Sequence, residues 1–142
     1  MLALAAWLLP NTAWAEMLSV AVQEANFRAG PSKKHEVVFT AIQHYPVKVV
    51  KRLGGWVNVQ DFEGDRAWVA ASLLSKRATV IVKVNRANLR TQPTTQSKVA
   101  GKTELAEVFV VSERKGRWLR LTFGDEERGW IRDDLVWGYD AK

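Results

Sequence analysis

The chain has 142 residues, of which 47% are hydrophobic and 25% charged, and it carries a formal net charge of +6. This is the composition of an ordinary globular protein, and the length allows one domain or two small ones. The absence of cysteine excludes disulfide frameworks, thiol catalysis and zinc sites that use cysteine. Seven tryptophans are an unusually large number for this length.

The first residues have the pattern of a secretory signal peptide. The apolar segment Leu2–Leu9 precedes Ala13 and Ala15, which place small residues where signal peptidase reads. We therefore expect residues 1–15 to be a signal peptide and the mature protein, from Glu16 onward, to be periplasmic or exported. A membrane anchor is the competing interpretation, but the apolar segment is far shorter than the roughly 20 residues that a bilayer requires. We expect no stable membrane insertion after cleavage.

The rest of the chain consists of one segment written twice. Trp56 matches Trp118 and Trp68 matches Trp130, and both pairs are 62 positions apart. The same offset, without a gap, pairs Asn26 with Asn88, Arg28 with Arg90, Pro31 with Pro93, Gly54 with Gly116 and Leu73 with Leu135. Because the matches fall on glycine, proline, tryptophan and alternating valines, they indicate two copies of one domain. We expect the domains to cover residues 16–76 and 77–142.

Each copy reads as a series of short strands. In the first copy, a long loop follows the first strand, and β-branched residues over 47–51 then predict a strand that ends at the glycine turn 54–55. The period of two over 56–59 predicts a second strand of that hairpin. It places Val57 and Val59 on the inner face and the tryptophan at 56 on the outer face.

The later part of each copy continues in the same way. The polar turn 61–65 closes a hairpin onto the strand 67–69, and residues 72–74 are typical of a short 3₁₀ turn. No segment longer than about eight residues keeps a helical period after the signal peptide. The fold class is therefore predicted to be all-β, with a small antiparallel barrel in each copy.

Two motifs carry a resemblance to a known family. Residues 26–31, NFRAGP, and residues 88–93, NLRTQP, resemble the N-x-R-x-G-P loop of bacterial SH3-like (SH3b) domains. Residues 129–131, GWI, resemble their closing G-W-V strand. The resemblance covers essentially the whole mature chain, and the sequence is similar to small exported proteobacterial proteins with two tandem domains. Ala67 and Gln92 depart from it, because each replaces a glycine.

The resemblance implies two tandem small SH3-like barrels after an N-terminal signal peptide, with an aromatic platform on each barrel for a proline-rich or otherwise extended peptide. The expected ligand-binding residues are Trp56, Trp68, Trp118, Trp130, Arg28 and Arg90. Alternatively, the rings pack on the long loop and on one another to complete two small cores. The arginines could stack on the rings, pair with an acidic turn, or stay free for an anionic ligand.

Enzyme chemistry has no support in the sequence. His35 and His44 both fall in predicted loops of the first copy, and the second copy has no histidine at the matching positions. No nucleophile or carboxylate stands at motif spacing beside them. The acidic turns 61–65 and 125–127 lack the spaced ligands of a calcium loop. We expect a protein that is not an enzyme and has no cofactor and no metal site.

The linker between the copies is short. If the first barrel ends near Leu74 and the second begins near Thr79, the four residues between them span at most about 14 Å. The barrels must then nearly touch, and we expect Trp137 and Tyr139 at the interface between them.

The charge pattern and the family resemblance together suggest a function. The basic excess is spread evenly over both copies and is not interleaved with aromatic residues, so nucleic acid is not an expected partner. Weak attraction to anionic envelope polymers and ordinary solubility both explain it. We interpret the chain as a non-catalytic exported binding module for peptidoglycan peptides or an extended segment of an envelope protein. The alternative is a structural accessory subunit of an envelope complex, with no small ligand. The sequence leaves the oligomeric state open.

Overall fold

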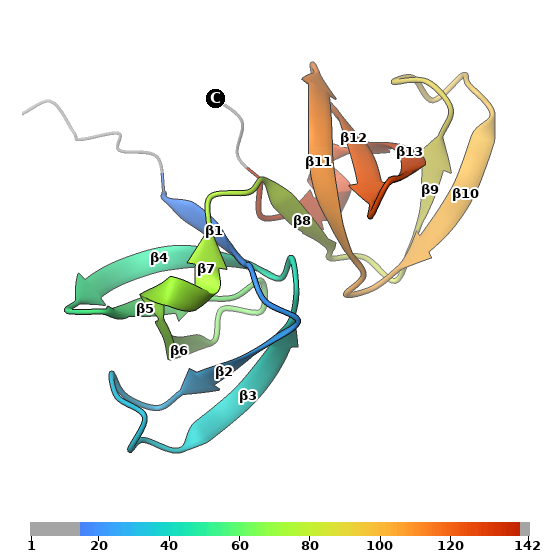
Figure 1. The fold of residues 1–142 in the computed structure, drawn as a ribbon. Coiled ribbons are helices and arrows are strands. Elements are labelled where there is room, and N and C mark those ends of the chain that lie inside the picture. Colours follow the sequence, from blue (N-terminus) through green and yellow to red (C-terminus); the bar gives the residue numbers. More distant parts are fainter. Residues whose placement is uncertain (1–14, 140–142) are drawn as a thin grey trace, which may run out of the picture.

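The computed structural model describes residues 15–139, which fold into two β-barrels in tandem (Figure 1). Each barrel is one seven-stranded antiparallel sheet, and the only helices in the described residues are two 3₁₀ turns. The predicted all-β fold class, with a small antiparallel barrel in each copy, is thereby confirmed. The expected signal peptide lies outside the described residues, apart from Ala15. Neither helical turn within residues 15–139 is long and apolar enough to cross a bilayer.

The first barrel has its strands in the order β3-β2-β6-β5-β4-β1-β7. They are β1 (Met17–Val20), β2 (Glu24–Arg28), β3 (Val37–Ile42), β4 (Pro46–Leu53), β5 (Trp56–Gln60), β6 (Arg66–Ala70) and β7 (Leu74–Ser75). The 3₁₀ turn η1 (Ala71–Leu73) lies within one residue of its predicted position.

The second barrel repeats this order as β10-β9-β13-β12-β11-β8-β14. Its strands are β8 (Thr79–Val82), β9 (Arg86–Arg90), β10 (Val99–Glu104), β11 (Val108–Lys115), β12 (Trp118–Phe123), β13 (Glu126–Arg132) and β14 (Val136–Trp137). The 3₁₀ turn η2 (Asp133–Leu135) separates the last two strands.

The motif predicted as a loop begins inside a strand. Asn26 and Asn88 lie in the middle of β2 and β9, where Asn26 is opposite Thr40 and Asn88 is opposite Lys102. The loop starts only after Arg28 and Arg90. The alternation of exposed and buried residues along both strands accounts for the difference, because it continues through the asparagines.

The core of the first barrel contains an aromatic cluster. The rings of Phe27 and Phe39 stack with centroids 4.7 Å apart, and Tyr45 meets Phe27 edge-on at 6.3 Å. Val57 and Val59 point inward, at 0% and 1% exposure, as the period of two predicts.

The core of the second barrel is mainly aliphatic. Its fully buried residues include Leu89, Leu119, Leu121 and Ile131, with Phe109 as the large ring. Both cores bury short β-branched and aliphatic side chains because each inward strand position is closed off by the barrel. The barrels are thus alike in architecture and different in the residues that fill them.

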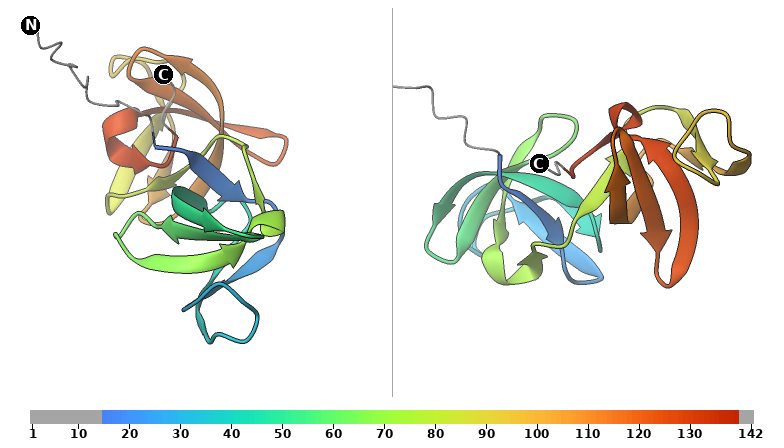
Figure 2. Two further views of the ribbon diagram at one scale, coloured as in Figure 1. Left: turned by 90° about the vertical axis from the view of Figure 1, so that its left-hand side faces the viewer. Right: turned by 90° about the horizontal axis from the view of Figure 1, so that it is seen from above.

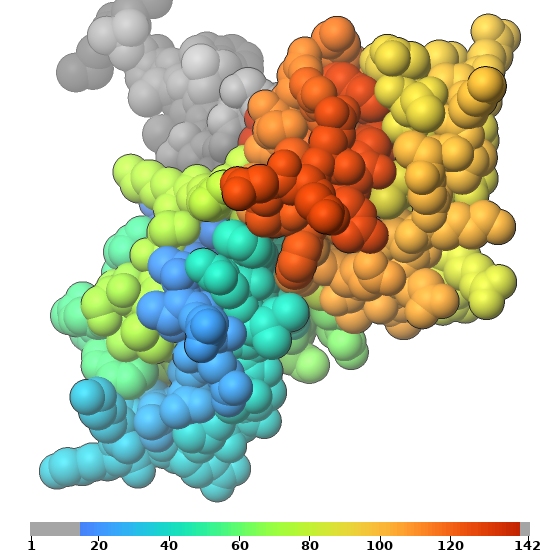
Figure 3. Space-filling model, turned by 45° about the vertical axis from the view of Figure 1, so that its right-hand side comes forward, coloured from blue at the N-terminus to red at the C-terminus, as the bar shows by residue number. Residues whose placement is uncertain are grey.

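The two barrels touch beside the short linker, as Figures 2 and 3 show. The Oγ of Ser19 in β1 donates to the carbonyl of Arg77 in the linker at 2.9 Å. Gly138 has a φ of +132°, and a side chain there would come within 2.8 Å of Pro46 in the first barrel. Tyr139 packs against the second core and lines a cavity between the barrels, whereas Trp137 pairs with Ile81 in the second sheet.

Candidate functional site

A groove on the first barrel brings together charged, polar and aromatic side chains that could recognise a ligand. It is a cavity of about 290 Å³ between β2, the loop after β2, the start of β5 and the turn η1. Its lining residues are Glu24, Asn26, Arg28, Lys33, Trp56, Ala70, Ser72 and Leu73. Two of the six expected ligand-binding residues, Trp56 and Arg28, therefore meet in one cavity.

Trp56 stands at the wall of this groove because of the turn that precedes it. Gly54 adopts a φ of +59°, which favours glycine, and the chain then enters β5 directly at the tryptophan. Trp56 is opposite Ala70 on β6, and the amide of Ala71 donates to the carbonyl of Gly55 at 2.8 Å. The backbone hydrogen bond thus holds the start of β5 beside η1, and the half-buried Trp56 lines the cavity.

Arg28 lines the same groove but uses part of its guanidinium to hold the loop. Its Nη1 donates to the carbonyls of His35 at 2.9 Å and Lys33 at 3.2 Å. In the second barrel, Nη1 of Arg90 donates in the same way to the carbonyl of Ser97 at 3.0 Å. Backbone carbonyls are thus the partners of both guanidinium groups, in place of the acidic turn considered from the sequence. Arg28 also lines the cavity.

Trp68 lies on the same outer face as Trp56 but does not line the groove. It is opposite Asn58 on β5 and is half-buried. The ammonium of Lys51 lies 5.6 Å from the centre of its ring. This is a cation–π contact made by lysine, while Arg28 is the cross-strand neighbour on β2. The two rings therefore face different surroundings.

The second barrel keeps the tryptophan of the groove and changes the residues around it. Trp118 begins β12 and is half-buried, like Trp56. Its cross-strand neighbour is Arg132, where the first barrel has Ala70, and Asp134 stands where the first barrel has Ser72. Nε of Arg132 lies 3.3 Å from Oδ1 of Asp134, an ion-pair distance without hydrogen-bond geometry. A charged pair thus stands where the first groove has small side chains.

Trp130 is a packing residue, with only 5% of its surface exposed. Arg120 lies directly opposite it on β12, and the ammonium of Lys115 is 5.6 Å from the ring centre. The sequence brings Trp130 and Trp118 onto one face, as expected. However, the buried ring of Trp130 offers little surface to a ligand.

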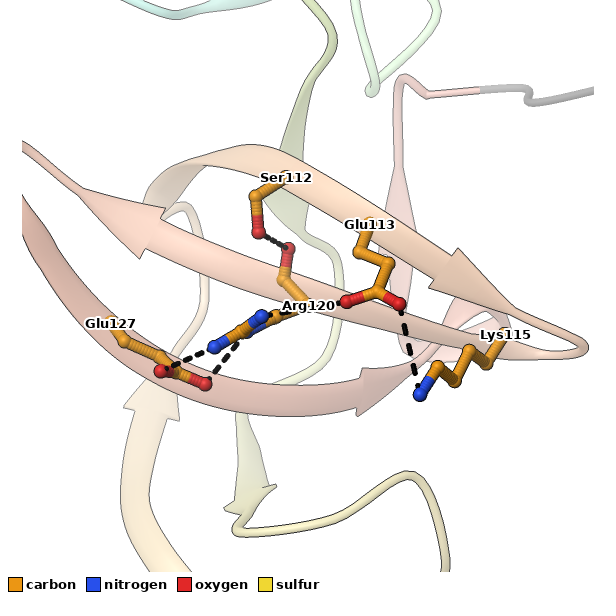
Figure 4. A network of polar contacts seen from close by, with 5 residues as sticks. All are labelled: Ser112, Glu113, Lys115, Arg120 and Glu127. Carbon is orange, nitrogen blue, oxygen red and sulfur yellow. Dashed lines mark hydrogen bonds and ion pairs between the residues drawn. The ribbon is translucent and has the colours of Figure 1, made fainter.

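A network of charged side chains covers this part of the second barrel (Figure 4). Nε and Nη2 of Arg120 donate to the two carboxylate oxygens of Glu127, both at 2.7 Å, and Nη1 lies 3.4 Å from Glu113. Lys115 completes the network at 3.7 Å from Glu113. The hydrogen bonds from Arg120 lower the pKa of the Glu127 carboxyl. The first barrel has Asn58, Asp65 and Lys51 at the corresponding positions and so lacks this network.

Sequence reasoning missed Glu24, Lys33 and Ser72 as groove residues. The repeat gave no signal for them, because the second copy has Arg86, Thr95 and Asp134 at those positions. Their position along β2, the loop and η1, next to the predicted tryptophan, is the feature that could have identified them.

The two histidines lie apart. His35 accepts or donates a hydrogen bond with Ser32 at 2.9 Å in the exposed loop. His44 has a φ of +75° in the turn between β3 and β4, and burial, with a smaller effect of Arg77, lowers its pKa. Within residues 15–139, no three histidine, aspartate or glutamate side chains are grouped to hold a metal ion.

Both barrels match one family model. The model is described as bacterial SH3 domain, and it matches residues 21–76 and again residues 83–138. The two matches cover most of the sequence, so this chain belongs to the bacterial SH3 domain family, as the sequence motifs indicated.

Among curated proteins, the chain is similar to "Putative N-acetylmuramoyl-L-alanine amidase YrvJ" of Bacillus subtilis (strain 168), with 23% identity over 128 residues. The match takes in 82% of this chain and 24% of the relative, so the chain spans about a quarter of that protein. Solved structures with lower similarity include NlpC1 from Trichomonas vaginalis, with 12% identity, 96% of this chain and 50% of that chain covered, and a TM-score of 0.39. Endolysin LysPBC5 CBD has 14% identity, 90% and 96% coverage, and a TM-score of 0.34.

Proposed function

We propose that the chain is a non-catalytic, exported binding module that recognises peptidoglycan peptides or an extended segment of an envelope protein. The groove beside Trp56 is the proposed binding site. The observation that carries the proposal is that the groove is open on the first barrel, where Ala70 and Ser72 leave the tryptophan beside a cavity of about 290 Å³.

The chemistry of the groove suits a short peptide in an extended conformation. A half-buried indole offers a flat apolar surface, and such rings often dominate binding energy at protein interfaces. Glu24 and Lys33 place opposite charges in the lining, and the backbone of a peptide can follow a groove of this kind. Stem peptides of peptidoglycan carry free carboxylates, which Lys33 and the unused nitrogens of Arg28 would pair with.

The family membership and the relative support a role at the cell wall. N-acetylmuramoyl-L-alanine, in the name of the Bacillus subtilis relative, is the unit that joins the sugar strands of peptidoglycan to its peptides. The shared portion is about a quarter of that protein, and both barrels match the bacterial SH3 domain, so we assign binding and not cleavage to this chain. Export, with residues 1–15 as signal peptide and domains at 16–76 and 77–142, belongs to the same proposal.

Cosedimentation with purified peptidoglycan tests the proposal. The wild-type chain should pellet with the polymer, and Trp56→Ala should weaken binding about tenfold or more. Trp118→Ala is the matched control, since it removes the same ring from the groove occupied by charged residues, and it should change binding less than twofold. Equal losses in the two variants, with unchanged melting temperatures, would contradict the assignment of the site.

Cross-linking in the native envelope distinguishes two kinds of peptide ligand from each other. It also distinguishes both from the alternative function, a structural accessory subunit of an envelope complex. A wild-type chain that does not bind peptidoglycan, yet cross-links at Trp56 to one envelope protein, would identify an extended protein segment as the ligand. Cross-links that avoid the groove and persist in Trp56→Ala would favour the accessory subunit of an envelope complex.

A further inference from the structure

A second recess lies between the barrels, away from the groove at Trp56. It consists of two adjoining cavities, of about 430 Å³ and 310 Å³, that are both lined by Ile42 of the first barrel and Phe123 of the second. His44 borders the larger cavity, and Arg128 and Phe109 border the smaller one. We call this recess the inter-barrel cleft.

Two apolar side chains of the cleft occupy positions at which the two copies have different residues. Ile42 is 58% exposed and its counterpart in the second copy is Glu104. Phe123 is 51% exposed and its counterpart in the first copy is Asp61. Each copy has therefore placed a large apolar residue at a position where the other has a carboxylate. Both residues face the same cleft, where exposed apolar surface marks a candidate interaction site.

Arg128 supplies a charge that has no acidic partner. Its guanidinium carbon lies 5.9 Å from the ring centre of Phe109, and it forms no ion pair within residues 15–139. Glu107, the one carboxylate in the lining of the two cavities, accepts the backbone amide of Glu104 at 3.0 Å. Burial, with a smaller effect of Arg77, lowers the pKa of His44 and so disfavours a second cation in the cleft. The cleft therefore combines apolar side chains with a cation held at one end.

We propose that the inter-barrel cleft binds an extended acidic peptide segment of a partner protein. One large apolar side chain of that segment lies between Ile42 and Phe123, and a carboxylate pairs with the guanidinium of Arg128. The paired cavities favour an extended chain because they continue on both sides of the two apolar residues. This site goes beyond the proposed groove and does not depend on it.

Backbone geometry supports a defined recess. His44 and Ala106 hold corresponding turns of the two barrels at φ values of +75° and +70°, which non-glycine residues adopt at a cost of about 1 kcal/mol or more. His44 lines one cavity and Ala106 lines the other. The two strained turns thus border the cleft from opposite barrels.

A titration followed by two-dimensional ¹H–¹⁵N NMR on the full chain tests the proposal. The probe is a synthetic nine-residue peptide with a central leucine and two glutamates on each side among serines. We expect shifts at Ile42 and Phe123, and binding at least about tenfold weaker for Phe123→Asp, which introduces the first-copy residue. Arg128→Gln should weaken binding about tenfold, and a peptide with lysines in place of glutamates should not bind.

Two control variants make the result specific. Leu53→Asp replaces an equally exposed apolar residue, at 59% exposure, on the far end of β4 and should leave the affinity unchanged. Trp56→Ala should also leave it unchanged, so failure here and failure of the groove are distinguishable. Absence of cleft shifts at millimolar peptide, or equal binding of the lysine peptide, would overturn the proposal. Concentration-dependent dimerisation abolished by Phe123→Asp would overturn it as well, by assigning the cleft to a second copy.

Discussion

The grooves of the two barrels start from the same tryptophan and differ in the two residues beside it. On the first barrel, Ala70 and Ser72 leave the ring of Trp56 at an open cavity. On the second barrel, Arg132 and Asp134 bring an ion pair to the equivalent place. Two side-chain differences on the same backbone therefore separate the barrels. The first barrel has a groove that can accept a ligand, and the second has two charged side chains that pair with each other in that place.

The hairpin tips show a second difference of the same kind. Asp61 is buried, and its Oδ1 accepts the amides of Glu63 at 3.0 Å and Asp65 at 2.9 Å. Its counterpart Phe123 is exposed and points its ring into the inter-barrel cleft. In the first copy this position stabilises its own turn, and in the second it forms part of a surface. Within this turn Asp61 is thus buried, while Glu63 and Asp65 remain exposed at the tip.

The largest expected effect is on the free energy of unfolding when one large core residue is truncated in each barrel. Phe27→Ala should lower the free energy of unfolding by about 3–5 kcal/mol, because it removes the fully buried ring that stacks on Phe39. Leu89→Ala, at the matching position, should cost less, about 2–4 kcal/mol, because a smaller volume is lost. Urea denaturation followed by tryptophan fluorescence measures both. Equal costs would show that the aromatic cluster adds nothing beyond the volume that it fills.

The second-largest effect is expected when the residues beside the two tryptophans are exchanged between the barrels. Ala70→Arg with Ser72→Asp should place the charged pair of the second barrel beside Trp56 and weaken peptidoglycan binding about tenfold, roughly 1.4 kcal/mol. The reverse exchange, Arg132→Ala with Asp134→Ser, should open a cavity at Trp118. Cosedimentation measures both pairs against wild type, with melting temperatures as the control for folding. Unchanged binding after the first exchange would show that the groove is not the site.

A smaller effect is the pH dependence of stability that Tyr45 causes in the first barrel. Burial, followed by the nearby carboxylate of Asp61, raises the pKa of Tyr45 above its ordinary value of 10.0. The unfolded chain then loses this proton at a lower pH than the folded chain. The stability that Tyr45 contributes is therefore complete below pH 10 and falls as the pH rises above it. The slope is at most about 1.4 kcal/mol per pH unit, reduced by solvent because the ring is half-buried.

Tyr45→Phe provides the comparison. Denaturant midpoints measured from pH 9 to pH 11 should fall less steeply for the variant than for wild type, and Tyr139 is present in both proteins. The second barrel has Glu107 at the position of Tyr45 and should show no such slope. Parallel curves for wild type and variant would mean that Tyr45 ionises equally in both states.

The fold could be predicted from the sequence because it depends on features that both copies share. The alternation at Val57 and Val59, the turn at Gly54 and the repeat itself each follow from backbone geometry, which both copies must keep. The site was harder to predict because it depends on the positions where the copies differ. Glu24 and Lys33 have no matching partner in the second copy, so an argument from the repeat passes over them.

Burial of the tryptophans could not be predicted from their spacing. Trp68 and Trp130 occupy matching positions on the closing strand, yet Trp130 is buried and Trp68 is half-buried. We attribute the difference to the neighbouring strand, where Arg120 stands opposite Trp130 and Asn58 stands opposite Trp68. The period of two places a side chain on a face and does not say which neighbour covers it.

The smallest expected effect tests this last cause. Arg120→Asn introduces the first-copy residue opposite Trp130 and removes both hydrogen bonds to Glu127. Because cross-strand neighbours lie within about 5.5 Å of each other, the shorter side chain should uncover the ring. The indole N–H of Trp130 should then exchange with solvent faster, while the melting temperature changes little, since exposed ion pairs contribute little to stability.

The pKa of Glu127 is lowered in the folded chain, so its pairing is complete above the ordinary glutamate range and is lost as the pH falls through the folded value. Wild-type protein in acid should therefore approach the exchange rate of the variant, and Asn58→Ala in the first barrel, which removes no ion pair, should show no such pH dependence at Trp68. Exchange at Trp130 that is equally slow in wild type and variant at both pH values would mean that the ring is buried by the barrel itself, and that the charged network only lies beside it.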